Sequence, residues 1–134
     1  MNENVQLTKQ YFDALSKGNM EFVASVFADH VIWHQPGNSI VSGIIKGKEA
    51  LFAHLGRFME LSQGTFAIDA VDYLAPNGNM VSAAIHFKAK AHGKSMAMKG
   101  MDLMRFENGK IVEVWLFSED GTAEDDFWTA MSKA

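Results

Sequence analysis

The chain has 134 residues, 48% of them hydrophobic and 21% charged, which predicts a single globular domain over residues 1–134 with one hydrophobic core. Its net charge of −4, without a basic cluster, argues against nucleic acid or an anionic membrane as a partner. It has no cysteine, which excludes disulfides and thiolate catalysis and is compatible with a cytoplasmic location, and no apolar run approaches the roughly 20 residues that span a bilayer.

Hydrophobic spacing and turn signals divide the chain into three helices followed mostly by strands. Apolar residues at helical spacing mark the helices; Gly18 ends the first, and Asn19 can cap the second. The expected elements are, in chain order, a helix over residues 5–17, a helix that begins after Asn19 and includes Phe27, a strand over 31–35, a loop or short strand over 38–46, a helix over 48–61, strands over 65–75, 80–91, 95–106 and 111–117, and a helix over 123–131.

This order of elements predicts an α+β fold in which the N-terminal helices pack on one face of a mostly antiparallel sheet. The predicted strands of about twelve residues are longer than the usual length of about five or six. Long, strongly twisted strands can curl around a helix and leave a cavity between the two layers.

A lone aspartate, Asp102, lies in an apolar strand that precedes the strongest turn signal in the chain, Asn108-Gly109. Asn-Gly between two apolar runs predicts a hairpin, because both turn positions need positive φ. With a two-residue loop, Asp102 faces Trp115, whereas a three-residue loop with a bulge would slip this register. Alternation places Asp102 on a face with three apolar residues: Met98, Met104 and Phe106.

A carboxylate on such a face is poorly solvated, so we expect its pKa to rise and regard it as a candidate functional group. The alternative is a solvated Asp102 at the rim of the sheet, or an ion pair with Lys99 or Arg105. Alternation points both cations to the opposite face, which weakens the ion-pair alternative.

The order of elements resembles the nuclear transport factor 2-like superfamily, a conical α+β fold of three N-terminal helices on a curved sheet that encloses an apolar pocket. The segments YFDALSKGN (11–19) and VFADHV (26–31) look like the first two helices and the next strand of ketosteroid isomerases. The segment GMDLMRFENGKIVEVW (100–115) is similar to the penultimate hairpin of those isomerases and of SnoaL-like polyketide cyclases. The resemblance covers nearly the whole chain, but this fold hosts many functions.

The resemblance implies roles for individual residues. Ketosteroid isomerases use an aspartate base and an oxyanion hole of a tyrosine and a protonated aspartic acid. By position, the tyrosine matches Tyr11, and Asp102 matches both the protonated aspartic acid and the acid/base aspartate of the cyclases. The base position, before a proline, is Gln35, which cannot take a proton at neutral pH, so steroid isomerisation is not expected. His34 is a second candidate base, although alternation places it on the face opposite Gln35.

We therefore expect the pocket to bind a small apolar molecule, with no cofactor. As an enzyme of the isomerase or cyclase type, the chain would transfer protons on a carbonyl compound, with Asp102 as acid/base or hydrogen-bond donor and Tyr11 at the oxyanion. The alternatives are a non-catalytic ligand-binding or association module, which the loss of the base at Gln35 favours, and a dehydratase-type lyase that uses a histidine. The residues expected to line the ligand are Trp33, Phe58, Met98, Met104 and Trp115.

Two further expectations concern metals and assembly. No two histidines have metal-ligand spacing on one element, so a metal site is not expected; His54 is expected at the surface. The last hairpin carries apolar residues on both of its faces. The helices can bury only one of these faces, so another protein surface is expected to bury the other. A homodimer through the sheet is therefore expected.

Overall fold

The computed structural model describes residues 2–134 and consists of four helices and one six-stranded sheet. The helices are α1 (Glu3–Lys17), α2 (Met20–Val26), α3 (Lys48–Leu61) and α4 (Gly121–Lys133). The strands are β1 (Phe27–Gln35), β2 (Gly43–Lys46), β3 (Ala67–Asn77), β4 (Met80–Ala91), β5 (Lys94–Glu107) and β6 (Lys110–Ser118).

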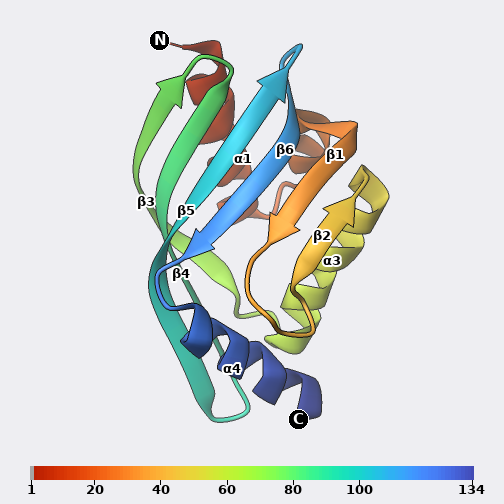
Figure 1. Ribbon diagram of the computed structural model, residues 1–134, viewed down its shortest axis with the longest axis vertical. Coiled ribbons are helices and arrows are strands. Elements are labelled where there is room, and N and C mark those ends of the chain that lie inside the picture. The colour runs from red at the N-terminus through yellow and green to blue at the C-terminus, as the bar shows by residue number, and fades with distance from the viewer. Residues whose placement is uncertain (1) are drawn as a thin grey trace.

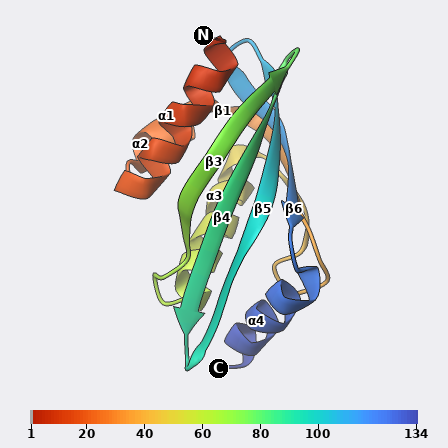
Figure 2. The same ribbon diagram turned by 90° about the vertical axis from the view of Figure 1, so that its left-hand side faces the viewer.

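The sheet has the strand order β2-β1-β6-β5-β4-β3, and only the β1–β6 pair is parallel among the described strands. The helices α1, α2 and α3 cover one face, and α4 lies across one end of the sheet (Figures 1 and 2). The expected α+β fold, with three N-terminal helices on a mostly antiparallel sheet, is confirmed.

Local chemistry explains where α1 begins and ends. The side chain of Asn2 accepts hydrogen bonds from the backbone N–H groups of Asn4 and Val5, which the helix leaves without partners. At the other end, Gly18 adopts a left-handed φ of 71°, a conformation that glycine takes without steric cost. These caps fix the direction of α1, whose buried face carries Tyr11 toward the sheet.

The second helix is shorter than predicted, because Phe27 belongs to β1 rather than to α2. Phe27 is fully buried and packs edge-on against the rings of Tyr11 and Phe52, at centroid distances of 5.5 and 6.4 Å. A short apolar run fits both helical and strand periodicity, so only this packing decides the boundary. Residues 43–46, expected as loop or short strand, form the edge strand β2.

The predicted pairing of Asp102 with Trp115 is wrong, because Asp102 pairs with Leu116. The two-residue turn itself is present, since Glu107 pairs with Lys110. The register then shifts by one residue on β6, where Ile111 and Val112 are both buried. Two consecutive buried residues break the alternation of a regular strand, and a bulge accommodates them.

Candidate functional site

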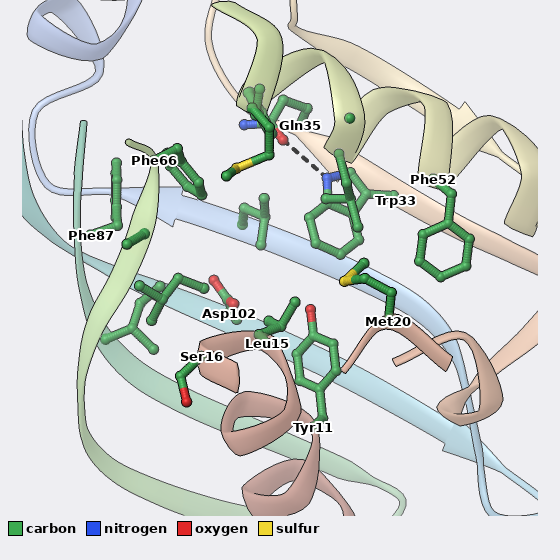
Figure 3. Close-up of a pocket in the computed structure, with 18 of the residues that line it drawn as sticks. Tyr11, Leu15, Ser16, Met20, Trp33, Gln35, Phe52, Phe66, Phe87 and Asp102 are labelled. Carbon is green, nitrogen blue, oxygen red and sulfur yellow. Dashed lines mark hydrogen bonds between the residues drawn. The ribbon is translucent and has the colours of Figure 1, made fainter. Parts of the chain in front are cut away.

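A cavity of about 1010 Å³ lies between the helices and the sheet (Figure 3). This volume is at the upper end of the range for small-molecule sites. Its wall is mostly apolar and rich in aromatic rings: Tyr11, Trp33, Phe52, Phe58, Phe66 and Phe87. The polar side chains in the lining are few: Tyr11, Ser16, Lys17, Gln35, Asp102, Ser118 and Glu124.

Asp102 enters the cavity wall from the middle of β5, and its side chain is 6% exposed. Burial raises the pKa of its carboxyl group from 3.8 to about 7. Within residues 2–134, no protein group forms a hydrogen bond or ion pair with this carboxyl. The bulge at Val112 does not change the face of Asp102, because alternation along β5 is unbroken.

Tyr11 reaches the same cavity from α1, and Figure 3 shows its hydroxyl and the Asp102 carboxyl on neighbouring parts of the wall. Burial, and secondly the nearby charge of Asp102, raise the pKa of Tyr11 above its usual range, so the hydroxyl remains a proton donor. Its ring is held between those of Phe12 and Phe27, at centroid distances of 5.0 and 5.5 Å.

Gln35 ends β1, and its side-chain oxygen accepts two hydrogen bonds. Trp33 Nε1 donates to Gln35 Oε1 over 3.0 Å, and His54 Nε2 lies 3.0 Å from the same oxygen. Burial lowers the pKa of His54 to about 4, and the charge of Arg57 adds to this effect, so the imidazole is neutral at neutral pH.

The expectation that His54 lies at the surface is wrong, because His54 lies on the buried side of α3. Its position was readable from the sequence, since it lies three residues after Leu51 and four before Phe58, on the buried stripe of α3. Its contact with Gln35 joins two separate elements and had no local sequence signal.

Glu124 is a second carboxyl group in the cavity wall that the sequence analysis missed. The hydroxyl of Ser118 donates to its Oε1 over 2.5 Å, and Trp128 Nε1 donates to its Oε2 over 3.2 Å. Burial raises the pKa of Glu124. Its spacing from Phe127 and Trp128 places it on the buried stripe of α4, a signal that could have identified it.

His34 and Trp115 are outside the cavity lining. The expected position of Trp115 is therefore wrong, whereas His34 lies on the face opposite Gln35, as alternation predicts. Their rings stack on each other at 5.3 Å and 3°, and His34 Nε2 lies 2.7 Å from a carboxylate oxygen of Glu113. His34 points to the sheet face opposite Gln35, because neighbouring side chains in a strand alternate. Trp115 points to the face opposite Asp102, because the register on β6 is shifted by one residue. We call this side of the sheet, which carries His34, Ile44, Leu103, Glu113 and Trp115, the outer sheet face.

The other expected binding residues divide into two groups. Trp33 and Phe58 line the cavity. Met98 and Met104 are buried on the same face of β5 as Asp102 but lie outside the lining, because they fill the core on either side of it along the strand.

The described residues contain no cluster of three or more histidine, aspartate or glutamate side chains placed to hold a metal ion. Across residues 2–134, no helix combines the length and the apolar content that crossing a bilayer requires.

Known structures share this architecture over nearly the whole chain. A protein of unknown function with a cystatin-like fold from Xanthomonas campestris is 42% identical, with a TM-score of 0.91 over 96% of this chain and 98% of its own. Bal32a, from a soil-derived mobile gene cassette, is 27% identical, with a TM-score of 0.90 over 94% and 96% of the two chains.

A candidate SnoaL-like polyketide cyclase from Jannaschia sp. CCS1 shares the fold at 14% identity, with a TM-score of 0.73 over 87% of this chain and 85% of its own. The family model for the SnoaL-like domain matches residues 8–114, a range that holds Tyr11, Gln35 and Asp102. The chain therefore belongs to the family of SnoaL-like domains.

Proposed function

We propose that this protein is a cofactor-independent enzyme that transfers a proton on a small apolar carbonyl compound bound in the cavity. One observation carries the proposal: Asp102, an unpaired carboxyl with a pKa of about 7, faces an apolar cavity into which the Tyr11 hydroxyl also opens. A general acid/base is most effective when its pKa lies near the working pH. A buried carboxyl is also a stronger electrostatic partner than one in water.

The reaction follows from what each group can donate or accept. The Asp102 carboxylate removes a proton from the carbon beside the substrate carbonyl. The electron pair of that C–H bond forms the carbon–carbon double bond of an enolate, and the π electron pair of the carbonyl moves to its oxygen. The neutral Tyr11 hydroxyl donates a hydrogen bond to the resulting oxyanion. The Asp102 carboxylic acid then returns the proton to another carbon in an isomerisation, or to the product oxygen once a new carbon–carbon bond closes a ring.

Solvent deuterium exchange tests this proposal without knowledge of the natural substrate. Purified protein is incubated in D₂O with 2-tetralone and other small apolar ketones, and loss of the proton signals beside the carbonyl is followed by NMR. The wild type is expected to accelerate exchange, and Asp102→Asn to lose about 100-fold or more of that acceleration. His34→Gln, a change on the outer sheet face, is the matched control and is expected to exchange like the wild type.

A non-catalytic ligand-binding module is the second candidate, and Gln35 favours it, because an amide stands where the related isomerases have their base. The two candidates differ in one result. Binding of these ketones without faster exchange by the wild type supports the binding module and contradicts the enzyme. Equal acceleration by the wild type and Asp102→Asn contradicts the assignment of Asp102 as the acid/base.

A further inference from the structure

The side-chain amide of Gln35 has a fixed orientation. An indole N–H can donate a hydrogen bond but cannot accept one. The atom of Gln35 that lies 3.0 Å from Trp33 Nε1 must therefore be the amide oxygen, Oε1. This contact removes the usual ambiguity between the oxygen and the nitrogen of a glutamine side chain.

His54 occupies the second acceptor position of the same oxygen. Because Gln35 Oε1 can only accept, the hydrogen of the neutral His54 ring must sit on Nε2. Trp33 and His54 thus use both lone pairs of this oxygen. A ligand in the cavity cannot donate a hydrogen bond to it without displacing one of the two rings.

The amide nitrogen of Gln35 is left as a free donor toward the cavity. Among residues 2–134, every side-chain nitrogen or oxygen that is fully buried has a hydrogen-bond partner. Gln35 Nε2 has no protein partner, so it must keep accessible surface. Gln35 as a whole is only 7% exposed and lines the cavity, so this surface opens inward.

Figure 3 shows Gln35 near α3 and Tyr11 on α1, with the labelled apolar side chains and the cavity between them. The cavity thus has a donor at each of two separated positions, the N–H of Gln35 and the O–H of Tyr11. Between these positions the wall is formed by rings such as those of Phe52 and Phe66. A ligand that satisfies both donors must be apolar in its middle and carry an acceptor toward each of them.

We infer that the substrate is an apolar ring compound with two oxygen acceptors, the reacting carbonyl at Tyr11 and Asp102 and a second carbonyl or ether oxygen at the N–H of Gln35. The inference rests on the proposed function for the position of the reacting carbonyl. Trp33 and His54 are positioning residues for this contact, because they hold the amide in place. An apolar amine is disfavoured at this end, since its N–H groups would meet the N–H of Gln35.

Two matched fluorescent probes test the second acceptor. In 6-acetyl-2-naphthol, the phenol stands for the enol of the reacting carbonyl and the acetyl oxygen for the second acceptor; 2-naphthol lacks the acetyl group. Their affinities are measured by titration with the wild type and with Gln35→Glu, which keeps the length of the side chain and the contacts from Trp33 and His54. The ratio of the two affinities in each protein isolates the contribution of the amide N–H.

The wild type is expected to bind 6-acetyl-2-naphthol about tenfold more tightly than 2-naphthol, the value of about one hydrogen bond. Gln35→Glu, titrated at a pH at which its carboxylate is ionised, is expected to reduce this ratio to about one or below, because both oxygens of an ionised carboxylate can only accept. Gln35→Met, which has neither donor nor charge, is the second variant should Gln35→Glu fail to fold, and the same reduction is expected. An unchanged ratio in the folded variant would overturn the inference.

Variants of His54 test whether this residue positions the Gln35 amide or only contributes to packing. His54→Gln can still donate to the Gln35 oxygen and is expected to keep the wild-type ratio. His54→Leu removes one of the two donors that hold the amide oxygen, leaves only the contact with Trp33, and is expected to lower the ratio severalfold. A purely structural role would change the affinity for both probes equally, which would overturn the positioning role.

These binding ratios are independent of deuterium exchange. Absence of exchange with an intact ratio contradicts the proposed reaction and supports the second acceptor. Normal exchange with a ratio of one in the wild type supports the reaction and overturns the second acceptor.

Discussion

The Asp102 carboxyl and the Tyr11 hydroxyl open into the same cavity from β5 and α1, two elements far apart in the sequence (Figure 3). Neither group has a hydrogen-bond partner within the described part of the chain, although both residues are at least 94% buried. Burial without a partner costs stability. Buried polar groups without partners are commonly found at functional sites. The loss of folding stability that Asp102 causes can be measured.

Replacing Asp102 by asparagine is expected to stabilise the protein at about pH 8 and to change it little near pH 4. The folded-state pKa of about 7 lies above the ordinary 3.8, so folding favours the protonated carboxyl. The free energy of unfolding of the wild type must then fall as the pH rises through this window, whereas asparagine stays neutral throughout. The difference at high pH is at most about 4 kcal/mol, at about 1.4 kcal/mol for each pKa unit.

Urea unfolding at a series of pH values measures this difference. A variant no more stable than the wild type at high pH would mean that Asp102 is solvated or paired. Carbon NMR of the carboxyl group gives an independent check, and a midpoint near 4 would contradict the burial argument.

Tyr11→Phe is expected to lower the rate of ketone deuterium exchange by about 100-fold, because it removes one donor to the oxyanion. Its thermal stability is expected to be unchanged or slightly raised, since the hydroxyl has no protein partner to lose. Tyr73→Phe, at a tyrosine that is 57% exposed on β3, is the control. An equal rate in Tyr11→Phe and the wild type would remove Tyr11 from the reaction.

Conversion of Δ5-3-ketosteroids by the wild type is expected to be absent or very weak, because the Gln35 amide cannot abstract a proton. Gln35→Asp is expected to gain measurable conversion, which is followed by the absorbance of the conjugated product. A positioned base contributes about 10²–10⁴-fold, so the gain is measurable even if the new carboxylate is imperfectly placed. Robust conversion by the wild type would show that another residue supplies the base.

Local periodicity was sufficient to predict most elements and the face of Asp102. The alternation of β5 places Asp102 beside Met98 and Met104 whatever the register of the next strand. The partner of Asp102 could not be predicted, because the bulge at Val112 accompanies the burial of two consecutive residues, Ile111 and Val112. Such burial is a tertiary property, and a one-residue slip changes every cross-strand partner.

Some polar residues of the cavity were likewise predictable from the sequence, and others were not. Tyr11 and Gln35 were found through positional resemblance, whereas the contact between His54 and Gln35 joins α3 to β1 and has no local signal. Glu124 was missed because an acidic residue near the start of a helix is usually solvated and favourable there. Its burial becomes visible only once α4 packs against the end of the sheet.

We propose that the outer sheet face joins two copies of the chain in a homodimer. Apolar side chains gather on this face, and Ile44, at its edge, is 61% exposed. Ile44→Glu would bury a charge in such an interface and is expected to give a monomer, while the wild type gives the mass of a dimer by light scattering at micromolar concentration. Ile40→Glu, at a residue that is 51% exposed in the loop between β1 and β2, adds the same charge outside the sheet and is expected to remain dimeric. A monomeric wild type would contradict the proposal, and so would a dimer that Ile44→Glu leaves intact.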